Sequence, residues 1–175
     1  AVGYFAATVV IMLLTHLIEI FMWSAVLVGI EAIPVFRDAF FYVATTYTIR
    51  ALDERTWDAF AALVEENNGV FGGCWCIGFH PEGCDREAPG VNRRRKLERV
   101  QGGTTHAALV FDGDACLGWC QFGAPDELPR IKSRAAYEKG ATTAPDWRIA
   151  CNFVGKGHRR KGVAAAALAG ALDLI

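Results

Sequence analysis

Basic residues and glycines separate a short apolar run from an Ala-rich segment near the C-terminal end of the chain. Residues 147–154 have the composition of a strand, and residues 163–175, dominated by Ala and Leu, predict a helix. Between them lie Arg159, Arg160, Lys161 and Gly162. The first amides of a helix have no partner inside it, and the helix dipole adds positive charge there. The order strand, basic glycine loop, helix therefore predicts a site for an anion such as phosphate.

Two common phosphate loops do not fit this stretch. A P-loop requires Gly-Lys followed by Ser or Thr, but Gly157 follows Gly155-Lys156. A dinucleotide fingerprint requires a third glycine at position 160, where the chain has Arg. A solvated basic turn between a strand and a helix remains the alternative.

The spacing that does fit is Arg-x-x-Gly-x-Ala, formed by Arg159, Gly162 and Ala164. It resembles the acyl-CoA pyrophosphate loop of the GNAT acetyltransferases, whose pattern is Gln/Arg-x-x-Gly-x-Gly/Ala. The resemblance implies acetyl-CoA as co-substrate, with no metal. The residues that it assigns to acetyl-CoA binding are Phe153, Val154, Arg159, Arg160, Lys161, Gly162, Val163 and Ala164.

The elements before this loop occur in the order expected of such a domain. Residues 47–52 alternate as a strand does, and the helix that follows has apolar residues at 3.6-residue spacing. Asp112-Gly113 between two apolar runs, 106–111 and 115–123, predicts a tight hairpin. The resemblance covers residues 48–175 and implies an α/β (α+β) fold with a mixed, mostly antiparallel sheet and flanking helices. The family's later strands would lie beyond Ile175, so we expect the domain to be truncated at its C-terminus.

The implied activity is transfer of an acetyl group from acetyl-CoA to an amine acceptor. Backbone amides at 160–164 would hold the pyrophosphate, and backbone groups at the end of the preceding strand would hold the pantetheine arm. Polarising the thioester carbonyl stabilises the charge that develops on it. A base must also remove the amine proton, and this catalytic residue stays unknown: Asp146 and Glu66 are only guesses.

Two other clusters could do chemistry. Cys74, Cys76, His80 and Cys84 are possible soft ligands, but their crowded spacing fits zinc poorly, and buried thiols in a substrate-facing strand are favoured. The run 92–99 is basic, yet it lacks interleaved aromatic residues and the chain has a net charge of -1. We therefore expect a solvated helix face there and no nucleic acid partner.

Residues 1–47 differ in composition from the rest, with Arg37 as their one basic residue. Residues 1–30 contain only two ionisable side chains, His16 and Glu19, which lie three apart and would share a helix face. An apolar run of this length predicts a transmembrane-type helix that anchors the protein in a membrane. The soluble domain, 48–175, would then be cytoplasmic, and the whole protein would be cytoplasmic if the first segment is not inserted.

Residues 34–48, with His16-Leu17-Ile18-Glu19 before them, resemble the pore helix and outer helix of a bacterial two-helix potassium channel. The Gly-Tyr-Gly of a selectivity filter is missing, because Ile49-Arg50 follows Thr48. The resemblance therefore implies ancestry or fusion rather than conduction. Two alternatives stay open beside a membrane-tethered acetyltransferase: a channel-derived membrane protein that binds a ligand, and an inactive hybrid that at most binds CoA.

Overall fold

The computed structural model describes residues 2–29, 47–140 and 143–175. The chain divides into two compact units, Ala1–Thr46 and Tyr47–Ile175. The pore-helix prediction for 34–46 lies outside the described residues. In the first unit the described element is the helix α1 (Val2–Gly29).

Helix α1 carries the expected His–Glu pair on one face, with His16 Nδ1 3.5 Å from Glu19 Oε2 and both side chains exposed. In the part of the chain that the structure describes, no helix is both long enough and apolar enough to cross a membrane. The transmembrane helix and the membrane partnership predicted for residues 1–30 are therefore not supported. The His16–Glu19 pair lies near the middle of α1.

The second unit is built on a four-stranded sheet, in the order β1-β2-β3-β4, in which every neighbouring pair is antiparallel. The strands are β1 (Thr48–Ala51), β2 (His106–Asp112), β3 (Ala115–Gly123) and β4 (Arg148–Val154). The predicted hairpin between β2 and β3 is confirmed, but its turn residues are Gly113 and Asp114, because Asp112 still pairs with Ala115. Gly113 adopts φ 58°. The expected α/β (α+β) fold with helices flanking a sheet is thus confirmed, whereas the described sheet is antiparallel throughout rather than mixed.

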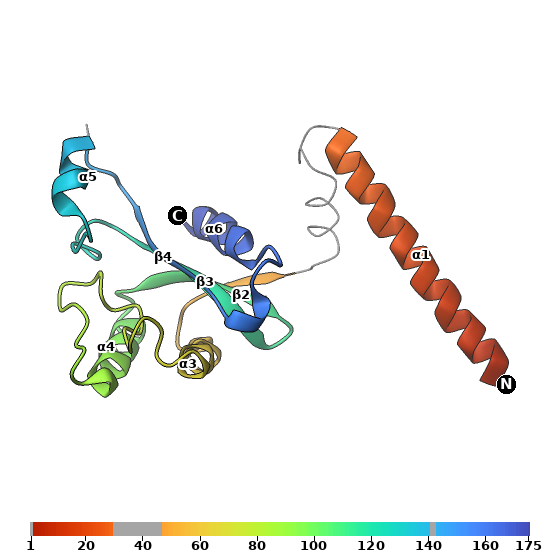
Figure 1. The fold of residues 1–175 in the computed structure, drawn as a ribbon, viewed down its shortest axis with the longest axis horizontal. Coiled ribbons are helices and arrows are strands. Elements are labelled where there is room, and N and C mark those ends of the chain that lie inside the picture. Colours follow the sequence, from red (N-terminus) through yellow and green to blue (C-terminus); the bar gives the residue numbers. More distant parts are fainter. Residues whose placement is uncertain (1, 30–46, 141–142) are drawn as a thin grey trace. The chain divides into compact units, whose positions relative to one another are not determined.

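Helices cover both faces of this sheet (Figure 1). On one face lie α3 (Trp57–Glu66) and α4 (Pro89–Gln101), and on the other lies α6 (Val163–Leu174). Because side chains alternate along a strand, β3 serves two cores: Trp119 packs with Phe60 of α3, and Phe122 belongs to the cluster around Ala167 of α6. The short helix α5 (Arg134–Gly140) lies in the connection from β3 to β4.

The segment from Val70 to Cys84 differs from its prediction. It forms successive turns rather than a substrate-facing strand, and several of its non-glycine residues have positive φ, among them Phe71, Trp75 and Cys76. The buried Asn92 of α4 holds these turns, because its Nδ2 donates to Gly73 O at 2.7 Å. The hydrogen bond from Asn92 to Gly73 joins residues nineteen positions apart, and sequence periodicity carries no signal of such a contact.

Candidate functional site

Strand β4 lies at the edge of the sheet and leads directly into the basic loop. Gly155 N donates to Leu117 O at 2.9 Å, while Val154 is the register partner of Gly118. In an antiparallel ladder this makes Gly118 and Val154 a pair without direct hydrogen bonds, so the N–H and C=O of Val154 point away from β3. By the same alternation, those of Asn152 point to the open edge as well.

The β4 ladder contains a bulge. Gln121 pairs with Cys151 and Phe122 pairs with Ile149, so Ala150 has no register partner in β3. A bulge leaves its extra residue unpaired and bends the strand locally, and such bulges are frequent beside functional sites. The backbone of β4 is thus not paired in register with β3 at Ala150.

The loop after β4 turns on Gly162, which is the N-cap of α6 and has φ 80° and ψ -5°. This left-handed conformation suits glycine, and a Cβ added at Gly162 would meet nothing within 4 Å. Ala166 N donates to Gly162 O at 3.0 Å, which begins the helical ladder. The amides of Val163 and Ala164 come earlier in the chain than Ala166, so neither has a helical carbonyl four residues before it to which it could donate.

Three cations precede these amides. Arg159, Arg160 and Lys161 are all exposed, and none of the ion pairs found among the described residues includes them. Arg160 adopts φ 62°, which is unusual for a residue with a side chain. Uncompensated positive charge, free amides and open space around Gly162 together make a site that fits a phosphate or pyrophosphate.

Two contacts that sequence reasoning missed hold the loop in place. The hydroxyl of Tyr47 donates to Lys161 O at 2.8 Å, and Asn152 Nδ2 donates to Ala164 O at 3.0 Å. Asn152 lies on β4, so its amide joins the strand to the first turn of α6. A third contact, from Arg159 Nε to Val154 O at 3.5 Å, lies at the open edge of β4. The Asn152 contact could have been suspected only from a polar residue in an otherwise apolar strand, and the Tyr47 contact had no signal.

The predicted binding residues are thus brought together, but not all in the same way. Val154, Arg159, Arg160, Lys161, Gly162 and Ala164 present backbone groups or side chains toward the loop and its open edge. Phe153 and Val163 are buried instead: Phe153 stacks on Trp119 at 4.6 Å, and Val163 packs in the α6 cluster. The Phe153 side chain therefore supports the strand, and the guesses for a base, Asp146 and Glu66, are both exposed residues outside the loop.

The cysteine and histidine cluster forms a second polar region, on the α4 side of the sheet. Among the described residues no group of three or more His, Cys, Asp or Glu side chains is placed to hold a metal ion. The buried Cys76 lies 3.2 Å from Cys151, sulfur to sulfur, and accepts from Trp119 Nε1 at 3.1 Å.

Burial lowers the pKa of Lys96, on α4, to about 8. The prediction of a wholly solvated face for 92–99 is therefore wrong at Asn92 and Lys96, which are fully buried.

His80 lies at the centre of this buried network. Its Nε2 accepts from Gln121 Nε2 at 2.8 Å, and its Nδ1 lies 3.2 Å from Glu127 O, to which a neutral imidazole can donate. Thr105 Oγ1 lies 3.1 Å from the same Nε2 and accepts from Lys96 Nζ at 2.8 Å. Burial, and then the charges of Lys96 and Arg99, lower the pKa of His80 to about 3.

We expect this histidine to make the fold acid-sensitive. Below its ordinary pKa of 6.5, His80 is protonated in the unfolded chain but not in the folded one, so the unfolded state binds more protons. The contribution of His80 to the free energy of unfolding should be fully present above about pH 6.5, and the free energy should fall by up to roughly 1.4 kcal/mol per pH unit below it. Urea denaturation followed by tryptophan fluorescence, between about pH 6.5 and pH 5, measures this slope.

His80→Gln is the matched variant, because it keeps a polar side chain that does not titrate. The interval stays above the ordinary pKa of Glu82, 4.5, which is also lowered in the folded protein, to about 2. The variant should lose most of the slope. The same slope in both proteins would show that other groups cause the acid sensitivity.

Comparisons with known proteins give one structural likeness. The chain is similar to a GCN5-related N-acetyltransferase from Ralstonia eutropha JMP134, with 16% sequence identity, a TM-score of 0.44, and coverage of 74% of this chain and 75% of that one. No protein-family model matches the chain, and no curated protein does. The likeness to a potassium channel finds no support. With so low a TM-score, function has to be argued from the site itself.

Proposed function

We propose that residues 47–175 bind acetyl-CoA and transfer its acetyl group to an amine acceptor. The observation that carries this proposal is the N-terminus of α6, where Gly162 turns the backbone after three exposed cations that form no ion pair among the described residues. Amides without helical partners, the helix dipole and these charges act together on an anion. The pyrophosphate of CoA would bind to this loop, through the amides of residues 160–164 and the charges of Arg159, Arg160 and Lys161.

The open edge of β4 supports the second half of the proposal. Val154 and Asn152 direct their N–H and C=O groups away from β3, so an extended, amide-containing arm can pair with them as an added strand would. An arm that leaves the pyrophosphate loop and follows this edge runs back along β4 toward the bulge at Ala150. Val154 lies four positions after Ala150, which corresponds to about 13 Å of strand.

The chemistry follows from that placement. Attack of a neutral amine on the thioester carbonyl carbon forms a C–N bond and places negative charge on the carbonyl oxygen. A backbone N–H on the uncommitted edge of β4 can donate to this oxygen and stabilise it. Collapse of the intermediate breaks the C–S bond and releases the CoA thiolate, while the amine proton passes to a base or to water.

Calorimetric titration of the full chain tests the proposal with two thioesters. Acetyl-CoA and S-acetylpantetheine share the acetyl group and most of the arm, but only the first carries the pyrophosphate. Hydrogen bonds to charged groups contribute about 1.5–3 kcal/mol each. Two of them should make acetyl-CoA bind at least about 100-fold more tightly than S-acetylpantetheine.

Transfer is measured separately, as CoA thiol released in the presence of simple amines. Release that depends on the amine, together with the affinity difference, would support an acetyltransferase. Absence of acetyl-CoA binding at millimolar ligand would contradict the proposal. Binding with no release for any amine would restrict the site to holding CoA.

A further inference from the structure

A second pocket lies at the other end of β4. It has a volume of about 350 Å³, within the range of small-molecule sites. Its lining includes Phe79, Tyr137, Trp147 and Ile149, so its walls are largely aromatic and aliphatic. Tyr137, Trp147 and Ile149 are 37%, 39% and 44% exposed, although large apolar side chains are usually covered in a folded domain. These surfaces are available to an apolar body.

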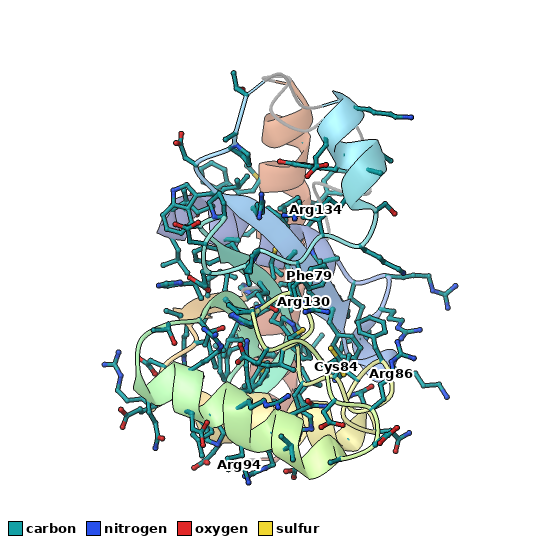
Figure 2. The ribbon with its side chains drawn as sticks, turned by 90° about the vertical axis from the view of Figure 1, so that its left-hand side faces the viewer. Phe79, Cys84, Arg86, Arg94, Arg130 and Arg134 are labelled. Atoms are coloured by element: carbon teal, nitrogen blue, oxygen red, sulfur yellow. The ribbon has the colours of Figure 1, made fainter. Side chains whose placement is uncertain are left out.

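The charged residues of this pocket have a single sign. Arg130 and Arg148 line it, and none of the described residues that line it carries a carboxylate. Arg130 is exposed and makes one long side-chain contact, from Nη1 to Pro81 O at 3.5 Å. Figure 2 shows Arg130 beside Phe79, and the backbone confirms this, because Arg130 N donates to Phe79 O at 3.1 Å.

Arg148 is held by the protein but keeps unused donor capacity. Its Nη1 donates to Leu128 O at 2.8 Å and to Pro125 O at 3.2 Å, which fixes the guanidinium at the first residue of β4. Its Nε is buried and has no hydrogen-bond partner in the described structure. An unpaired buried donor is unfavourable, so this nitrogen is a local cost of the way Arg148 is held, and only the rest of its guanidinium can face the pocket. A guanidinium fixed in this way is preorganised for a carboxylate.

The location of the pocket joins it to the proposed reaction. Ala150, the bulge residue of β4, belongs to its lining. The same strand thus carries the pyrophosphate loop at its C-terminal end and this pocket at its N-terminal end. A thioester arm laid along the open edge from Val154 would bring its acyl group toward Ala150, and a molecule in the pocket would approach from the opposite end.

We propose that this pocket binds the acceptor, and that the acceptor is an amine that also carries a carboxylate on an aromatic or aliphatic body. The assignment as acceptor site rests on the proposed acetyl transfer, whereas the ligand class rests on the pocket alone. The carboxylate pairs with the guanidinium groups of Arg130 and Arg148. The ring or chain packs on Trp147, Tyr137 and Ile149, which leaves the amine to face the bulge.

Ligand class is tested without acetyl-CoA, by NMR titration of the full chain with two probes. The probes are 3-phenylpropionate and its neutral analogue, 3-phenylpropanamide, neither of which has an amine. The acid should bind at least about 10-fold more tightly than the amide. Arg130→Gln should remove most of that preference. Arg94→Gln is the matched control, because Arg94 is an exposed arginine of α4 that pairs with Glu98 and does not line the pocket (Figure 2). It should leave the preference unchanged.

Acceptor role is tested with acetyl-CoA present, by comparing L-phenylalanine with 2-phenylethylamine, which lacks the carboxylate. We expect a kcat/KM at least about 10-fold higher for the amino acid, and loss of this ratio in Arg130→Gln. Equal binding of the acid and the amide would overturn the ligand class even if transfer occurs. Preferential binding of the acid without any transfer would contradict the acetyltransferase while leaving the ligand class supported. Transfer without a preference for the amino acid would overturn the acceptor assignment.

Discussion

Gly118→Ala lowers the free energy of unfolding by about 1–3 kcal/mol, the usual range for overfilling a packed site. A Cβ at Gly118 would lie 2.5 Å from Phe153 O and 3.2 Å from Val154 Cα, which are backbone atoms of β4 that cannot rotate away. It would also lie 3.0 Å from Val163 Cγ1 at the start of α6. The added methyl group therefore pushes on both elements that carry the candidate site. Urea denaturation of the full chain measures the loss.

Gly90→Ala is the control for the general effect of replacing glycine. Gly90 lies in the first turn of α4, and a Cβ there would meet nothing within 4 Å. Alanine should stabilise the helix by roughly 0.5–1 kcal/mol, because it restricts the unfolded chain and has a better helix propensity. Gly118→Ala and Gly90→Ala should therefore shift stability in opposite directions. Wild-type stability in Gly118→Ala would mean that β3 and β4 are not packed as closely as described.

The parts of this fold that the sequence predicts are those whose signal is local. Asp112-Gly113 between two apolar runs predicts the β2–β3 hairpin, which the structure forms with Gly113 and Asp114 as its turn residues. The strand, basic loop and helix from residue 147 onward follow from composition and from Gly162. These predictions needed no knowledge of what packs against the elements.

The parts that the sequence does not predict depend on distant partners. The apolar composition of Val70–Cys84 suggested a strand, but the segment forms turns, because Asn92 of α4 hydrogen-bonds to its backbone. In the sequence Lys96 is one more residue of a basic run, for which an exposed face is predicted, yet it is buried and its Nζ donates to Thr105 Oγ1. The pocket proposed to bind the acceptor likewise joins Phe79, Arg130 and Arg148, which no motif connects along the chain.

Gly162→Glu should weaken acetyl-CoA binding at least about 100-fold, a loss of roughly 2.7 kcal/mol. Two effects act together. Any side chain at φ 80° is strained by about 1–2 kcal/mol, and a carboxylate at the helix N-terminus occupies and repels the anion site. Gly162→Ala shares the strain without the charge, so it should reduce stability similarly and binding less. Circular dichroism and urea denaturation of each variant separate the effect on folding from that on binding.

The central claim is that the loop from Arg159 to Ala164 holds the pyrophosphate of acetyl-CoA. Calorimetric titration of the Gly162→Glu and Gly157→Glu variants with acetyl-CoA tests this claim most directly. Both variants add one carboxylate to the same loop, and Gly157 is exposed with nothing within 4 Å of an added Cβ. Gly157, however, lies in the short 3-10 turn (Lys156–His158) before the cations rather than at the N-cap of α6. We expect Gly157→Glu to bind acetyl-CoA within about 10-fold of the unmutated protein, and Gly162→Glu to bind at least about 10-fold more weakly than Gly157→Glu. Equal affinity in the two folded variants would contradict the assignment of this loop.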